Sequence, residues 1–169
     1  MKEIFCFIPA KSRSSRIKKK NSFVLGGHPL YSYPIRTAVD TGIFGDQEIV
    51  VSTDSKKIAK NSEALGGYVP YLRSDKLSRD PAGVFDVLID FFQKFPSYKF
   101  YKYVCILLPT SPFTSVLDVK LSVNQIKDFN HTCLMSVSKT EHNSYLSIKI
   151  EKGIVKPLFP DKIMLKSTL

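Results

Sequence analysis

The chain has 169 residues, of which 43% are apolar and 24% charged, and its 25 lysines and arginines against 15 acids give a net charge of +10. This length predicts one domain, and the composition excludes collagen-like and intrinsically disordered chains. No apolar run reaches the roughly 18 residues that a membrane span needs, so we expect neither a transmembrane helix nor a signal peptide. Three widely spaced cysteines inside apolar runs predict buried, reduced thiols and a cytoplasmic location.

The chain begins with a short apolar run at residues 4–8, which predicts a strand leading into a loop at Pro9. That loop, residues 11–20, carries six of the ten net positive charges and no acid, so we expect it to bind an anion. A solvated surface loop and a nucleic-acid or nuclear-localisation patch are the alternatives for such a run of charge. The six bases are Lys11, Arg13, Arg16, Lys18, Lys19 and Lys20.

Two more elements follow in the first half of the chain. Residues 29–39 have a loosely helical apolar spacing that Pro34 interrupts, which predicts a kinked helix. Residues 48–51 predict a second strand, and any of the polar residues 52–54 is suited to cap the helix that comes next. For Asp54 we favour this capping role over contact with a ligand.

The middle of the chain predicts a strand, a helix and a strand. Residues 69–72 resemble a short third strand, and Asp80 followed by Pro81 is a typical helix start with an apolar face at residues 84–92. Residues 103–108 are continuously apolar, as in strands buried on both faces of a parallel sheet.

The last elements complete the fold class. A helix is expected at residues 116–126, a strand at 132–137, and a hairpin from 145–150 and 154–155 around Gly153. Alternating strands and helices predict an α/β sandwich with a mainly parallel sheet, to which the tail adds a C-terminal β-hairpin.

Ligands bind in such sheets beyond the carboxyl ends of the strands. The basic loop, the turn at residues 52–54, Arg73 and the turn at residues 109–112 all follow predicted strands, so we expect them to share one site. A surface salt bridge to Asp75 or Asp80 is the alternative role for Arg73. The three histidines lack partners at metal-ligand spacing, and the chain has no Walker motif, no GxGxxG and no Ser-His-Asp pattern.

Several segments resemble, in register, the sugar-acid cytidylyltransferases, which include the acylneuraminate cytidylyltransferases (CMP-sialic acid synthetases) and their pseudaminic and legionaminic acid relatives. The segments are Ile8-Pro9-Ala10-Lys11, Lys20-Asn21, Leu25-Gly26-Gly27-His28-Pro29-Leu30, Val50-Val51-Ser52-Thr53-Asp54-Ser55, Val69-Pro70-Tyr71-Leu72-Arg73, Leu77-Ser78-Arg79-Asp80, Leu108-Pro109-Thr110-Ser111-Pro112, Ser136-Val137-Ser138 and Glu141-His142.

The resemblance implies a three-layer, Rossmann-like (GT-A-like) nucleotidyltransferase sandwich. Residues 1–169 would be a single nucleotidyltransferase-like domain, with a nucleotide-binding part at 1–140 and a partial sugar and dimerisation segment at 141–169. It also implies transfer of CMP from CTP to a sialic-acid-like 2-keto sugar acid with release of pyrophosphate, for lipopolysaccharide or capsule synthesis. Mg²⁺ is the implied cofactor and a homodimer the implied assembly, with no nucleic acid or membrane as partner.

Residue by residue, the resemblance implies that Lys20 and Lys11 act electrostatically in catalysis, Lys20 first. The nucleotide-binding residues that it implies are Ala10, Lys11, Ser14, Arg16, Lys20, Asn21, Arg73, Leu108, Pro109 and Thr110.

This sequence departs from the family pattern at several positions. Lys11 stands where the family has arginine, Arg13 replaces a glycine, and Leu108 replaces a glutamine that reads the cytosine edge. The family's Asp-x-Asp metal pair would fall beyond Leu169, so we assign no metal ligand in this chain. We therefore expect either a fragment of a longer product or, as the alternative function, a catalytically inactive remnant that binds a nucleotide or polyanion.

Overall fold

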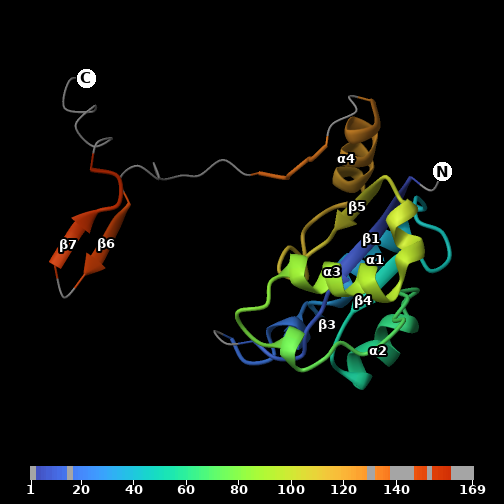
Figure 1. Cartoon of the computed structure of the whole chain (residues 1–169), viewed down its shortest axis with the longest axis horizontal. Helices are drawn as coiled ribbons and strands as arrows, with labels where there is room; N and C mark the ends of the chain where they lie inside the picture. The colour runs from blue at the N-terminus through green and yellow to red at the C-terminus, as the bar shows by residue number, and fades with distance from the viewer. Residues whose placement is uncertain (1–2, 15–16, 129–131, 138–146, 152–153, 161–169) are drawn as a thin grey trace. The chain divides into compact units, whose positions relative to one another are not determined.

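The computed structural model describes residues 3–14, 17–128, 132–137, 147–151 and 154–160 (Figure 1). The chain divides into two compact units, residues 1–131 and 132–169. The boundary predicted after residue 140 falls outside the described residues and stays a prediction. None of the described helices is long and apolar enough to cross a membrane.

A parallel sheet lies at the centre of the first unit. Strand β1 (Ile4–Pro9) pairs on one side with β4 (Ile49–Ser52) and on the other with β5 (Tyr103–Ile106). Two isolated parallel bridges place segment 68–72 beside β4, where a third strand was expected. The chain thus moves outward from β1 to β4 and then returns to the opposite side of β1. Ligands bind in open α/β sheets beside the strand where the order reverses in this way.

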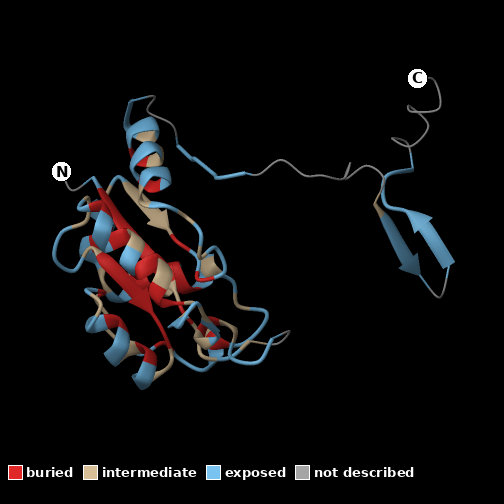
Figure 2. Cartoon of the chain, turned by 180° about the vertical axis from the view of Figure 1, so that it is seen from behind, coloured by how far each residue is buried: buried red, intermediate tan, exposed pale blue. Residues whose placement is uncertain are grey.

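Helices cover both faces of this sheet. Alternate side chains of β1 pack toward α1 (Ser32–Thr41), α2 (Lys56–Glu63) and α4 (Val116–Asp128) on one face, in a cluster that includes Ile35, Ile58 and Val119. The other side chains pack toward α3 (Val84–Lys94) and the short helix η3 (Pro96–Phe100). Figure 2 shows β1 and β4 in the colour of buried residues, whereas β5 is intermediate. The predicted three-layer α/β sandwich is confirmed.

An aromatic cluster anchors β1 against α3. Phe5 and Phe91 are almost fully buried, and their ring centroids lie 5.1 Å and 4.8 Å from that of Tyr98. Removing a ring such as that of Phe91 typically costs about 3–5 kcal/mol in a packed core. The cluster therefore fixes β1 rigidly and with it the start of the basic loop.

The region between β1 and α1 differs from the prediction. A small hairpin of β2 (Val24–Leu25) and β3 (His28–Pro29) turns through two glycines with positive φ, and α1 begins only at Ser32. Pro34 consequently lies in the first turn of α1, where its missing N–H interrupts no intrahelical bond. A proline in this position gives no reason to expect a kink in α1.

Two predicted helix starts are wrong. The cap of α2 is Ser55, whose hydroxyl accepts from the Ile58 N–H at 3.4 Å, and not one of residues 52–54. Helix α3 does not begin at Asp80: its N-cap is Gly83, whose N–H donates to the Asp86 carboxylate at 2.7 Å. Ser55 thus satisfies a free N–H of α2, and Asp86, in the first turn of α3, satisfies the N–H of its N-cap residue.

The second unit contains the predicted hairpin, formed by β6 (Ile148–Glu151) and antiparallel β7 (Ile154–Pro157). The strand predicted at residues 132–137 is wrong, because no described strand pairs with this segment and its backbone groups have no ladder to join. The expectation of buried cysteines holds for Cys6 alone, since Cys105 is half-buried and Cys133 is exposed; all three are free thiols.

Candidate functional site

A cavity of about 250 Å³ opens at the carboxyl edge of β1 and β5. Eight of the ten predicted binding residues line it: Lys11, Ser14, Lys20, Asn21, Arg73, Leu108, Pro109 and Thr110. Ala10 does not, because its side chain lies in the core and its N–H donates to the Ser52 carbonyl at 2.8 Å. Arg16 lies outside the described residues.

The basic loop is closed by its own hydrogen bonds. The Ser14 hydroxyl donates to the Ile17 carbonyl and accepts from the Lys20 N–H at 2.9 Å, where the short helix η1 (Lys20–Ser22) begins. The buried Asn21 amide donates to the Lys11 carbonyl at 2.9 Å. These bonds join the two ends of the loop and bring Lys11 and Lys20 to the same cavity.

Asp54 holds the loop from the neighbouring strand. Its two carboxylate oxygens accept from the N–H and the hydroxyl of Ser12, each at 2.6 Å. The predicted capping role of Asp54 is therefore wrong. In the structure, Asp54 connects the basic loop to the end of β4. No local pattern indicates this contact, because the partners are far apart in the sequence.

Ion pairs connect the loop to the segment before α3. Lys11 Nζ lies 3.3 Å from an Asp80 oxygen, and Asp75 pairs with Arg13 at 3.0 Å and with Arg79 at 2.6 Å. Except for Lys11, these side chains are largely exposed, so each pair adds little stability. An incoming anion of higher charge can therefore compete for these cations. A further cavity of about 250 Å³ runs along them and shares Lys11 and Ser14 with the first.

Arg73 is the most unusual residue of the site. It is only 5% exposed, and its Nε donates to the Ser78 hydroxyl at 3.2 Å. Its Nη2 is buried and has no hydrogen-bond partner in the described structure. The salt bridge considered as an alternative is not formed, since Asp75 and Asp80 pair with other cations.

Burial lowers the pKa of the Arg73 guanidinium, while the charge of Asp54 acts in the opposite direction. An arginine nonetheless keeps its proton in proteins. A buried, charged donor without a partner is unfavourable by about 1–3 kcal/mol or more. The cavity therefore holds a cation that an anionic ligand would satisfy.

The opposite wall follows β5. Leu108 is partly exposed, and its carbonyl accepts from the Ser111 N–H at 3.0 Å, which turns Pro109 and Thr110 toward the cavity. The sequence interpretation missed further lining residues from segment 77–87, including Leu77 and Ala82. Their small or apolar side chains carry no chemical signal that distinguishes them from core residues.

The described residues offer no cluster of three or more histidines, cysteines, aspartates or glutamates that could hold a metal ion. The nearby acids Asp54, Asp75 and Asp80 are already bonded to the basic loop. The residues present do not fit a resident Mg²⁺, and we derive no step through one.

The fold and the cavity together define a class of protein. Lys11, Lys20 and Arg73 converge, with no acid among the described lining residues, beside the strand where the sheet order reverses. This is the arrangement of an α/β protein that binds a phosphate-bearing ligand such as a nucleotide.

Comparison with known proteins identifies the family. The cytidylyltransferase family model matches residues 5–152, and the chain belongs to this family. It is 36% identical over 162 residues to the CMP-N,N'-diacetyllegionaminic acid synthase of Legionella pneumophila, and this match covers 94% of this chain and 68% of that protein. It is 36% identical over 108 residues to a pseudaminic acid cytidylyltransferase of Campylobacter jejuni, covering 63% of this chain and 46% of the relative.

A solved structure of CMP:2-keto-3-deoxy-manno-octonic acid synthetase in complex with CTP has the same fold, with a TM-score of 0.60. The two sequences are 20% identical, and the match covers 75% of this chain and 48% of the other. The chain thus spans about half the length of that protein and of the Campylobacter relative. The predicted nucleotidyltransferase fold is confirmed.

Proposed function

We propose that this chain supplies the nucleotide site of a cytidylyltransferase that transfers CMP from CTP to a sialic-acid-like 2-keto sugar acid and releases pyrophosphate. The names of the relatives, which act on legionaminic and pseudaminic acids, support this substrate class and a place in cell-surface glycan synthesis. The observation that carries the proposal is the buried, unpartnered Nη2 of Arg73 in a cavity that also contains Lys11 and Lys20.

The three cations have two roles in this proposal. A sugar hydroxyl gives up its proton to solvent water as its oxygen forms a bond to the α-phosphorus of CTP, and the bond from that phosphorus to the oxygen that bridges it to the β-phosphorus breaks. Negative charge moves onto the departing pyrophosphate, where Lys20 and Lys11 stabilise it. Arg73 binds and orients the nucleotide through its free N–H group. Leu108 packs at the base without a hydrogen bond to it.

Mg²⁺ belongs to the proposal as a family expectation, and no residue of this chain is assigned to it. A homodimer is proposed through the β6–β7 hairpin, because a two-stranded hairpin is marginally stable alone and one face is apolar. That face carries Ile148, Ile150, Val155 and Pro157. A cytoplasmic location without nucleic-acid or membrane partners stays a prediction.

A second candidate function is a nucleotide-binding protein of this family without transferase activity. It is favoured by the absence of a metal-ligand cluster among the described residues. It predicts the same CTP site but no chemistry.

A pyrophosphate-release assay with CTP, Mg²⁺ and N-acetylneuraminate, run beside a calorimetric titration with CTP, separates the two. Release that requires the sugar acid and is lost in Lys20→Ala supports the transferase, since Lys20→Ala removes charge beside the triphosphate. Binding of CTP without release supports the second candidate. A titration without heat and without a thermal shift contradicts both.

A further inference from the structure

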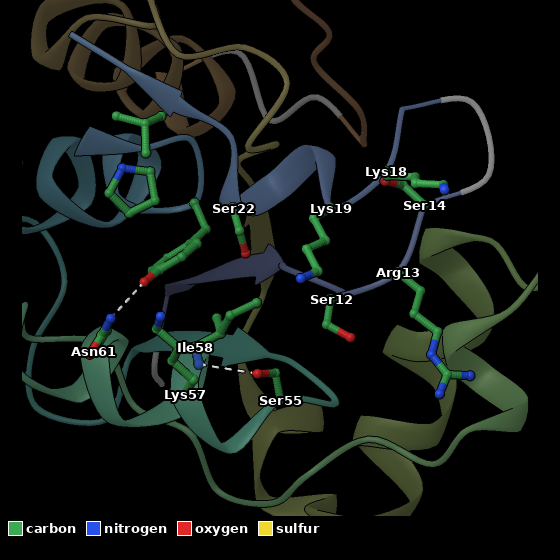
Figure 3. A pocket seen from close by; sticks show the side chains of 13 residues that line it. Ser12, Arg13, Ser14, Lys18, Lys19, Ser22, Ser55, Lys57, Ile58 and Asn61 are labelled. Atoms are coloured by element: carbon green, nitrogen blue, oxygen red, sulfur yellow. Dashed lines mark hydrogen bonds between the residues drawn. The ribbon is translucent and has the colours of Figure 1, made fainter. Parts of the chain in front are cut away.

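A second cavity lies on the other side of the basic loop, between the loop and α2 (Figure 3). Its volume is about 820 Å³, within the range of small-molecule sites. Of its lining residues, Ser14 alone also lines the proposed nucleotide cavity, and neither Lys20 nor Arg73 reaches it. The loop thus separates two pockets.

The walls of this second cavity are cationic. Lys18 and Lys19 come from the loop and Lys57 from α2, and none of the three forms an ion pair with a described residue. Arg13 also lines the cavity, but its guanidinium is bonded to Asp75. No acid is among the described lining residues. Like charges that face one cavity without a counter-charge favour an anion in it.

The backbone directs Lys19 into this space. Lys19 has φ 54° and ψ 35°, a left-handed conformation that is uncommon outside glycine, asparagine and aspartate. Strain of this kind concentrates at functional sites. The Lys19 carbonyl accepts from the Ser22 N–H at 2.9 Å, which holds the turn. In Figure 3 the Lys19 ammonium lies between the side chains of Ser12 and Ser22 and points into the cavity.

The facing wall adds hydrogen-bond donors and positive potential. Ser55 caps α2 at the cavity, so the positive end of the helix dipole is close to Lys57. The Asn61 amide closes the far end by donating to the Tyr31 hydroxyl at 3.0 Å. Donors on two opposite walls suit a group whose oxygens point in several directions. The oxygens of a tetrahedral phosphate do so, whereas those of a carboxylate lie in one plane.

We propose that the cavity between the basic loop and α2 binds a phosphate-bearing small molecule, held between Lys19 and Lys57. This site is separate from the nucleotide cavity and does not depend on the proposed transferase function. The ligand is free phosphate or a phosphate ester, since both present the same oxygens to the lysines.

Amide NMR shifts of the whole chain during a titration with inorganic phosphate, at constant ionic strength, test the proposal. We expect saturable shifts at residues 55–58, with affinity about tenfold weaker in Lys57→Ala, the loss expected for one charge-assisted contact. Lys56→Ala is the matched control, because it removes the same charge from α2 outside the cavity lining. Its affinity should equal that of the parent chain.

A parallel titration with a hexose phosphate identifies the source of the phosphate: tighter binding than free phosphate indicates an ester, and equal binding indicates the free ion. Both results support the site. Shifts that grow linearly without saturation, or equal loss in Lys56→Ala and Lys57→Ala, would overturn the proposal. Binding of single-stranded RNA in place of phosphate would also overturn it, because the loop would then be a nucleic-acid patch.

Discussion

Replacing Arg73 by methionine separates ligand binding from stability. In the unliganded chain the substitution removes one hydrogen bond, from Nε to the Ser78 hydroxyl at 3.2 Å, and Ser78 keeps its own bond to the Ser74 carbonyl at 2.9 Å. That loss is about 0.5–1.5 kcal/mol, and removal of a buried charge that has no hydrogen-bonded counter-ion offsets it. We therefore expect the melting temperature of Arg73→Met to be unchanged or raised.

The effect on CTP binding should be the opposite. A guanidinium N–H bonded to a charged phosphate contributes about 1.5–3 kcal/mol, so the affinity for CTP should fall between about tenfold and 150-fold. Calorimetric titration and thermal unfolding of the same samples give both quantities. Arg36→Met is the matched control, since Arg36 is exposed on α1 away from the cavity and should change neither. A lower melting temperature with unchanged CTP affinity would refute the reasoning.

The remaining predictions concern salt, base selectivity and pH. Affinity for CTP should fall steadily as the salt concentration rises, because exposed cations contribute to the site; affinity independent of salt would exclude this electrostatic account. The affinities for CTP and UTP should differ by less than about tenfold, because Leu108 cannot hydrogen-bond the base. Leu108→Gln should raise the preference for CTP. A parent chain that strongly prefers CTP would show that another group reads the base. Burial raises the pKa of Asp90, but hydrogen bonds from Lys94 and Tyr71 outweigh burial and lower it. Because the pKa of Asp90 is lower in the folded chain, these bonds stabilise the fold at pH values above the pKa of the unfolded carboxyl, which is about 4. This stabilisation is lost as the pH falls below that value. Asp90→Asn should therefore flatten the stability loss measured by urea unfolding below about pH 4, and an unchanged acid limb would contradict this.

The layers of the fold follow from patterns that act locally. The continuous apolar run of β1 and the spacing of Val87, Leu88 and Phe91 in α3 report burial directly, so the sandwich could be predicted. The apolar run of β5 predicted a strand but overstated its burial, because all four residues of β5 are only partly buried. The convergence of Lys11, Lys20 and Arg73 could also be predicted, because parallel strands end at the same edge of a sheet.

Contacts between distant segments could not be predicted. Asp54 has the residue type and the position of a helix cap. Ser55 nevertheless takes that role, and the Asp54 carboxylate is free to bond Ser12. The burial of Arg73 with an unpartnered Nη2 depends on how segment 73–83 folds over the strand ends. The sequence favoured a ligand contact for Arg73 over a surface salt bridge, but it gave no sign of this burial. The left-handed conformation of Lys19 could not be predicted either, because the residue that adopts it is neither glycine nor asparagine.

A crystal structure of this chain with CTP tests the central claim most directly. The account predicts the triphosphate between Lys11, Lys20 and Arg73, with an oxygen within hydrogen-bond distance of Arg73 Nη2 and the base beside Leu108. Nucleotide bound in the cavity beside α2, or an Arg73 that still lacks a partner in the complex, would contradict it.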